Sequence, residues 1–147
     1  MKVIVLNKKF NLHYEASDTY ECGMELVGNE VKSITSASVN IDESFAFINT
    51  TSQMYLINMY VAPYKQANSF YKINPYRKRK LLLHKTEITK IDYRIKKEHL
   101  TLIPTKLYFN HGKIKVEIAI ARKKNIHDKR EDIKKRQMAR EAKNKVC

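Results

Sequence analysis

The strongest constraint on the fold is an alternation of apolar and polar residues near the C-terminal end of the sequence. Every second residue from Ile114 to Ile120 is β-branched and apolar, which places these side chains on one face of an extended strand. A second alternating stretch, residues 100–109, precedes it, and residues 110–112 (Asn-His-Gly) supply turn residues between the two. The chain must therefore contain an antiparallel β-hairpin, and the opposite face of its last strand, residues 113–121, is expected to be exposed.

Further strands are predicted upstream of this hairpin. Residues 21–27 alternate in part, and residues 45–48 and 54–61 are rich in β-branched and aromatic side chains. The polar residues 49–52 lack glycine, which favours a loop of about four residues over a two-residue turn. These segments predict one isolated strand and a second hairpin.

Two segments have the apolar spacing of helices. Residues 30–39 and 85–98 carry apolar side chains three and four residues apart. Thr86 is a suitable N-cap for the second helix, and its lysines near residue 97 suit the negative C-terminal end. Residues 63–80 are polar and predict a long loop with little structure of its own.

Hairpins with at most two short helices predict a mainly β fold. The architecture that fits is a single antiparallel OB-like β-barrel over residues 1–121. Residues 122–147 differ, because they contain eleven basic and four acidic residues and no continuous apolar stripe. Such a segment cannot bury enough surface to order itself, so we expect a basic tail that is disordered when free and folds on a polyanion.

The charge indicates the class of partner. Lys and Arg number 29 against 15 Asp and Glu, which gives a net charge of +14. Nucleic acid and an anionic membrane are the two polyanions that would explain this excess. No run of about 18 apolar residues crosses a bilayer, and the N-terminal residues lack the apolar region of a signal peptide. We therefore expect a cytoplasmic protein that binds nucleic acid.

Aromatic and basic residues interleave between residues 60 and 85. Exposed rings stack on unpaired bases, and cations neutralise phosphates, so this composition favours RNA contact. The alternative is that the rings lie in the core and the cations are simply solvated. Two other basic segments are candidates for RNA contact. The alternative for the exposed face of residues 113–124 is that its cations are simply solvated, and the alternative for the tail is that it only keeps the protein soluble. The residues of the first cluster are Tyr60, Tyr64, Phe70, Tyr71, Tyr76, Arg77, Arg79, Lys80 and Lys85.

Catalysis and metal binding find little support in the sequence. The chain lacks a phosphate-binding loop, a dinucleotide fingerprint and a zinc-protease motif. Its five histidines are dispersed, and Cys22 and Cys147 are expected to be free thiols. A metal-independent nuclease built on His84 or His111 is conceivable, but nothing in the spacing selects either residue. We predict a protein that is not an enzyme and has no metal, no cofactor and no small-molecule substrate.

Several motifs resemble those of the small protein B (SsrA-binding protein) family. The most specific are residues 77–85 (RKRKLLLHK), 100–109 (LTLxPxKLYF) and 112–118 (GxxKVEI). The family typically has Leu-Arg where this chain has Ile34-Thr35, and glycines where it has Ala37 and Lys123. Further matches are residues 20–33 (YExGxxLxGxEVKS), Asn40, residues 44–48 (SxAxI), 58–64 (NMxxxPY) and 128–130 (DKR).

This resemblance implies a function and its partners. The barrel would bind the tRNA-like domain of transfer-messenger RNA, delivered with elongation factor Tu, and the protein would act as a monomer. The tail would enter the decoding centre of a stalled ribosome and fill the empty mRNA channel as a helix. The alternative is a structural ribosomal RNA-binding protein with an OB fold.

The resemblance and the charge pattern together predict two sets of contact residues. RNA contacts on the barrel are expected from Lys8, Lys9, Glu30, Lys32, Asn40, Tyr64, Arg77, Arg79, Lys80, His84, Lys106, Lys115, Lys123 and Lys124. Ribosome contacts of the tail are expected from His127, Asp128, Lys129, Arg130, Lys134, Lys135 and Arg136.

Overall fold

Short strands dominate the computed structural model, which describes residues 2–63 and 74–124. Within these residues there are nine strands and three helices, so the prediction of a mainly β fold with short helices is confirmed. In chain order they are β1 (Lys2–Leu6), α1 (Phe10–His13), β2 (Tyr14–Met24), α2 (Gly28–Thr35), β3 (Val39–Asn40), β4 (Phe45–Ile48), β5 (Met54–Ile57), β6 (Tyr60–Val61), β7 (Arg79–Leu82), α3 (Lys85–Glu98), β8 (Thr101–Asn110) and β9 (Lys113–Lys123).

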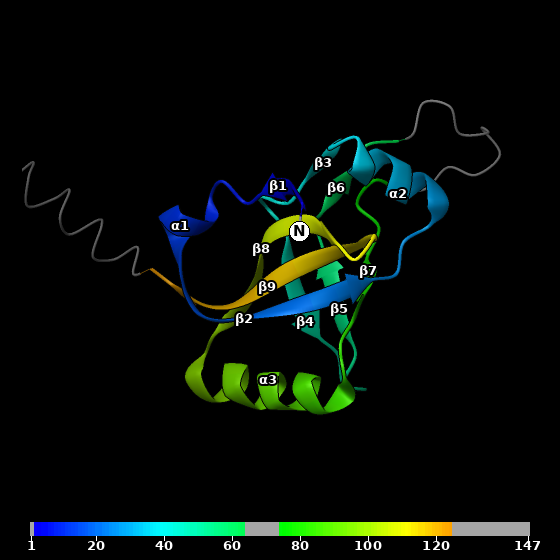
Figure 1. The fold of residues 1–147 in the computed structure, drawn as a ribbon. Helices are drawn as coiled ribbons and strands as arrows, with labels where there is room; N and C mark the ends of the chain where they lie inside the picture. The colour runs from blue at the N-terminus through cyan, green and yellow to red at the C-terminus, as the bar shows by residue number, and fades with distance from the viewer. Residues whose placement is uncertain (1, 64–73, 125–147) are drawn as a thin grey trace, which may run out of the picture.

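Seven of these strands form one antiparallel sheet in the order β1-β8-β4-β5-β7-β2-β9. Because β8 also pairs with β9, the pairings pass from β8 through β4, β5, β7, β2 and β9 and return to β8. Strands β3 and β6 form a separate pair. Figure 1 shows α3 lying across one end of the strands, while α2, β3 and β6 gather at the opposite end.

The β8–β9 hairpin is confirmed, together with its turn. His111 and Gly112 have φ of 52° and 74°, as a two-residue type I′ turn requires. Strand β9 continues to Lys123, two residues beyond the predicted end of the barrel at residue 121. The expectation that the opposite face of β9 is exposed is wrong at Ala119 and Ala121, because both are buried in a small apolar cluster with Phe10 and Ile103.

Helix α3 has the predicted bounds, whereas the earlier helix is shifted and shorter. The predicted N-cap of α3, Thr86, is wrong, because His84 occupies that position and Thr86 lies within the first turn. Ile88 and Ile91 of α3 are buried in the main core, as their spacing predicts. Helix α2 starts at Gly28 and ends at Thr35, and not at residue 39, because the chain adopts a left-handed conformation at Ala37.

Three strand predictions need correction. The predicted strand 21–27 corresponds only to the C-terminal part of β2, whose first residues are almost all exposed and carry no alternation. The predicted strand 54–61 divides into β5 and β6 at Asn58, where φ is 60°. The predicted loop 63–80 contains the start of β7, since Arg79 turns inward among its basic neighbours. Strand β1 was not predicted.

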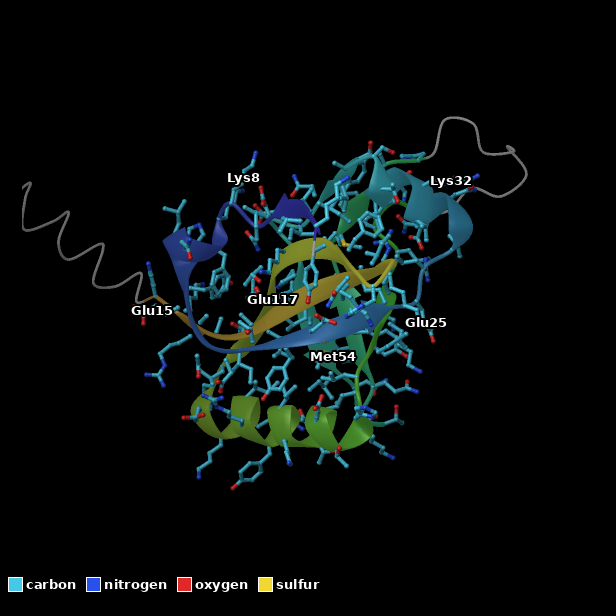
Figure 2. All side chains as sticks on the ribbon, viewed as in Figure 1. Lys8, Glu15, Glu25, Lys32, Met54 and Glu117 are labelled. Carbon is cyan, nitrogen blue, oxygen red and sulfur yellow. The ribbon has the colours of Figure 1, made fainter. Side chains whose placement is uncertain are left out.

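The main core lies between the strands and α3. It contains apolar side chains of β2, β4, β5, β7, β8 and β9, including Met54, which Figure 2 labels, and the thiol of Cys22. Cys22 is a free cysteine with no exposed surface, and burial raises the pKa of its thiol to about 12. None of the helices described combines the length and apolarity needed to cross a bilayer.

A buried ion pair joins α2 to β7. The guanidinium of Arg79, which has no exposed surface, donates through Nε to Glu30 Oε2 at 2.7 Å. Its other nitrogens donate to the carbonyl oxygens of Met59 at 2.8 Å, Arg77 at 2.9 Å and Pro75 at 3.1 Å. Arg79 therefore ties β7 to α2, to the connection between β5 and β6, and to the segment that precedes β7.

The charge of Glu30 is compensated from several sides. Burial favours its neutral form, but donors from Arg77 Nη2 at 2.6 Å and the Val27 backbone N–H at 3.1 Å, with the charge of Arg79, outweigh this effect. The pKa of Glu30 therefore lies below its ordinary value. Burial lowers the pKa of Arg79, and the adjacent Glu30 carboxylate opposes that change.

Helix α2 ends in a Schellman motif with an alanine at the position that normally favours glycine. The N–H of Ser38 donates to the carbonyl of Ser33 and the N–H of Ala37 to that of Ile34, both at 2.9 Å. Ala37 has a φ of 58°, where an L side chain crowds the backbone. This is one of the positions at which the small protein B family typically has glycine.

We predict that Ala37→Gly stabilises the protein by about 1 kcal/mol, because glycine adopts this conformation without the Cβ penalty. Urea unfolding would measure the change. Ala16→Gly, at an exposed strand position, is the matched control and should destabilise by about 0.5–1 kcal/mol. Equal destabilisation by both substitutions would contradict the left-handed conformation at Ala37.

We predict that Glu30→Gln destabilises the protein at pH 7 by about 3–5 kcal/mol, because it leaves the Arg79 charge buried without a counterion. A depressed carboxyl pKa contributes stability above about pH 4.3, and this contribution is lost as the pH falls toward the folded-state pKa. The variant should therefore lose less stability than the parent on acidification below about pH 4. Urea unfolding between pH 3 and 7 measures both effects, with the exposed Glu98→Gln as control. A variant as stable as the parent at pH 7 would rule out this role for Glu30.

Candidate RNA-binding surface

One group of predicted contact residues lies at the end of the molecule opposite α3. Figure 2 shows Lys8 and Lys32 at this end, and β3, which carries Asn40, lies nearby in Figure 1. The side-chain oxygen of Asn40 accepts from the N–H of Asp42 at 2.8 Å, and Asp42 Oδ1 accepts from the N–H of Lys8 at 3.0 Å. These bonds fix the backbone that presents Lys8 to solvent.

Lys9 is exposed, but its charge already has a partner. Its ammonium forms an ion pair and hydrogen bond with the carboxylate of Glu43. This contact raises the pKa of Lys9 and lowers that of Glu43. An RNA phosphate at Lys9 must therefore compete with Glu43.

A second group lies on the outer face of β2, β8 and β9. Lys106 Nζ is 4.0 Å from Glu117 Oε1 and 5.6 Å from the centroid of the Tyr108 ring. Glu117 lies directly opposite Glu21 in the β2–β9 register, and Lys115 follows one rung further. The face that was predicted as a row of cations is therefore mixed in charge.

Hydrogen bonds hold the carboxylate of Glu21 on this face. The hydroxyl of Tyr108 donates to Glu21 Oε2 at 2.7 Å, and Asn110 Nδ2 donates to the same oxygen at 3.1 Å. The bond from Tyr108, followed by that from Asn110, lowers the pKa of Glu21, while burial and this bond raise the pKa of Tyr108. Glu21 therefore stays ionised beside Lys115 and reduces the positive potential there.

A third group lies at the end of β9. Lys123 is exposed, whereas Lys124 donates through its backbone N–H to the carbonyl of His13 at 2.7 Å. Its ammonium donates to the carbonyl of Asn11 at 2.6 Å. Lys124 thus attaches the end of the described chain to α1.

The basic run before α3 divides into exposed and buried positions. Lys80 is half-buried on β7, and His84 is exposed immediately before α3. Arg77 is about one-third exposed, and its Nη2 is bound to Glu30. Arg79 and Glu30 were predicted to contact RNA, but in this structure their side chains are only 0% and 4% exposed and neutralise each other. Their ion pair holds α2 and β7 together beneath the surface.

Aromatic residues are arranged differently from the predicted cluster. The rings of Tyr60 and Tyr76 lie 5.2 Å apart. The sequence analysis missed Phe47 and Tyr55, whose rings stack on the outside of β4 and β5. The alternation in these two strands, with Ala46 and Leu56 inward, was the signal that could have identified them.

The remaining predicted contacts lie outside the described residues. They are Tyr64, Phe70 and Tyr71 in the earlier cluster and the seven tail residues His127, Asp128, Lys129, Arg130, Lys134, Lys135 and Arg136. Cys147, which was predicted to be a free thiol, also lies outside these residues.

The exposed groups of this surface are ammonium ions, amides, rings, carboxylates and the imidazole of His84. Ammonium ions suit contacts with phosphates, and rings suit contacts with unpaired bases. Across residues 2–63 and 74–124, no three His, Cys, Asp or Glu side chains converge to hold a metal ion.

Comparison with known proteins assigns the family. The sequence profile described as "SmpB protein" matches residues 4–147. An SsrA-binding protein of Ureaplasma parvum serovar 3 is 48% identical over 139 residues, which cover 95% of this chain and 97% of the relative. An SsrA-binding protein of Malacoplasma penetrans is 47% identical over 146 residues, which cover 99% of both.

A solved structure gives the same assignment. The structure described as "tmRNA-SmpB: a journey to the center of the bacterial ribosome" matches with a TM-score of 0.66 and 41% sequence identity. The match covers 83% of this chain and 84% of the matched chain. The sequence profile, the relatives and the shared fold together show that the chain belongs to the SmpB protein family.

Proposed function

We propose that this chain binds transfer-messenger RNA and acts with it in the rescue of stalled ribosomes, as an adaptor and not as an enzyme. The observation that carries the proposal is the family match over residues 4–147, which includes both the described fold and the basic residues beyond it. The names of its relatives refer to SsrA binding, and its structural neighbour is described with tmRNA and the bacterial ribosome.

The fold is suited to this role as an RNA-binding module. We interpret the closed succession of strand pairings as a barrel of the OB type, with α3 across one end. Barrels of this type commonly bind nucleic acid on their outer surface. In this view residues 1–121 form the module for transfer-messenger RNA, and residues 122–147 form the tail.

We assign phosphate contacts on the barrel to the predicted cations that remain on its surface. Within residues 2–63 and 74–124, Lys8, Lys80 and Lys123 form no ion pair with an acidic side chain, so their ammonium groups are available to phosphates. Phosphate contacts are also assigned to Lys9, Lys106 and Lys124. Each of these ammonium groups already has a partner within the protein, which it must release or share with the phosphate. The other contacts proposed are Lys32, Asn40, Tyr64, Arg77, His84 and Lys115.

The tail is assigned to the ribosome. His127, Asp128, Lys129 and Arg130 match the family motif, and Lys134, Lys135 and Arg136 follow it in a helix-prone run. We propose that this segment occupies the decoding centre and the empty mRNA channel as a helix. The protein would act as a monomer in the cytoplasm, delivered in a complex with transfer-messenger RNA and elongation factor Tu.

We predict preferential binding to transfer-messenger RNA. In a filter-binding assay, the purified protein should retain the transfer-messenger RNA of its own organism in a large excess of elongator tRNA. Equal competition by both RNAs would refute the proposal and favour a structural ribosomal component. Such a component would also remain on ribosomes in one-to-one amount, whereas an adaptor is released.

We predict that ending the chain after Lys124 abolishes peptide tagging on stalled ribosomes but leaves transfer-messenger RNA binding largely intact. This end point keeps the hydrogen bonds of Lys124 to α1. Within the full tail, Lys129→Gln with Arg130→Gln should impair tagging. Lys143→Gln with Lys145→Gln removes the same charge outside the motif and should not. Loss of RNA binding in parallel with tagging would contradict two separate modules.

A further inference from the structure

The outer face of β4, β5 and β7 carries a group of aromatic side chains outside the predicted RNA contacts. In the antiparallel register Phe47 lies opposite Tyr55, and Tyr55 lies opposite Lys80. Phe45 lies two residues from Phe47, so it faces the same side, and it is 38% exposed. We call Phe45, Phe47 and Tyr55, with Lys78 beside them, the aromatic platform.

The rings of this platform are already stacked. The centroids of Phe47 and Tyr55 are 5.7 Å apart with 26° between the ring planes. The ammonium of Lys78 lies 4.4 Å from the Tyr55 centroid and 5.8 Å from that of Phe47. A cation over an exposed ring is held weakly, so a ligand that offers a better partner to both groups can displace it.

Unpaired RNA offers such partners. Its phosphate attracts the displaced ammonium, and its base has a flat face that can continue the stack of two rings. A paired base offers only its edges, because its faces are covered by neighbouring base pairs. The aromatic platform therefore selects single strands over duplex.

The charges around the platform favour phosphates on its β7 side. The residues of β4, β5 and β7 include no Asp or Glu, and Lys78 and Lys80 lie on the β7 side. On the other side, Phe45 and Phe47 border a groove of about 730 Å³ that is lined by three acidic residues, Asp42, Glu43 and Asp92, and by three lysines, Lys9, Lys96 and Lys123. The groove is therefore mixed in charge, whereas the β7 side carries only cations.

We propose that the aromatic platform binds a single-stranded segment of RNA, with a base on the Phe47–Tyr55 stack and the backbone along Lys78 and Lys80. This site goes beyond the proposed function, whose barrel contacts concern a folded RNA domain and include neither ring nor Lys78.

The test uses the full-length protein and two RNA probes of equal length, a fluorescently labelled oligouridine and a duplex. Phe47→Leu with Tyr55→Leu keeps apolar side chains but removes the stacking faces. This variant should bind the single strand about tenfold more weakly, within the range measured for loss of a ring–base stack. Its affinity for the duplex should change less than about twofold.

The structure provides a matched control on α3. Tyr93 is 69% exposed and has Lys97 over its ring at 5.8 Å, but no second ring of the described part of the chain stacks on it. Tyr93→Leu should leave the affinity for the single strand unchanged. Thermal unfolding of each variant confirms that a lost affinity is not a lost fold.

A second readout follows the charge. Lys78→Gln should lower the slope of log affinity against log salt by about 0.7 for the single strand, the value of one phosphate contact. The same slope for Lys78→Gln and the parent protein would overturn the proposed phosphate contact.

Two other results would overturn the proposal. Equal effects of the platform and Tyr93 variants on the single strand would remove any special role of the stack. Normal RNA binding by the platform variant combined with weaker binding to ribosomes would identify a protein-docking surface instead. Because these measurements do not use transfer-messenger RNA, a failure of the proposed function leaves their result interpretable.

Discussion

The carboxylate of Glu30 is what allows a guanidinium to lie in the core of this protein. An isolated buried charge costs far more than its packing returns. Here Arg79 finds one counterion and three carbonyl oxygens, so each polar nitrogen of the buried group has a partner. Because β7 is the strand between β5 and β2, fixing Arg79 also fixes a short strand that joins them through only three paired residues on one side and two on the other. The surface residues on either side of Arg79 take their directions from that position.

This arrangement sorts the cations of a strongly basic chain into different roles. Arg79 is internal, Arg77 is divided between Glu30 and solvent, and Lys80 faces outward on the same strand. On the face formed by β2, β8 and β9, Glu21 and Glu117 accompany the lysines and reduce the positive potential. The net charge of the whole chain therefore indicates the class of partner, but it does not identify which side chains contact that partner.

Alternation and helical spacing predicted the elements whose buried and exposed faces differ. The β8–β9 hairpin and α3 are the clearest cases, because each has one apolar face against the core. Sequence patterns failed to predict the structure where tertiary contacts determine the backbone conformation or the direction of a side chain. The first residues of β2 are extended because β9 pairs with them, and the inward direction of Arg79 depends on Glu30, which is 49 residues away in sequence. For the same reason the predicted surface contained two buried residues, whereas Phe47 and Tyr55 were missed although the alternation of β4 and β5 places them on the outer face.

The thiol of Cys22 has a consequence for the redox behaviour of the folded protein. With a pKa of about 12, on the order of one such group in 10⁵ is ionised at neutral pH, and its sulfur has no path to solvent. Oxidants and alkylating reagents act on the thiolate, so they reach this residue only when β2 separates from its neighbours. The rate at which Cys22 is modified therefore reports how often the core opens at β2.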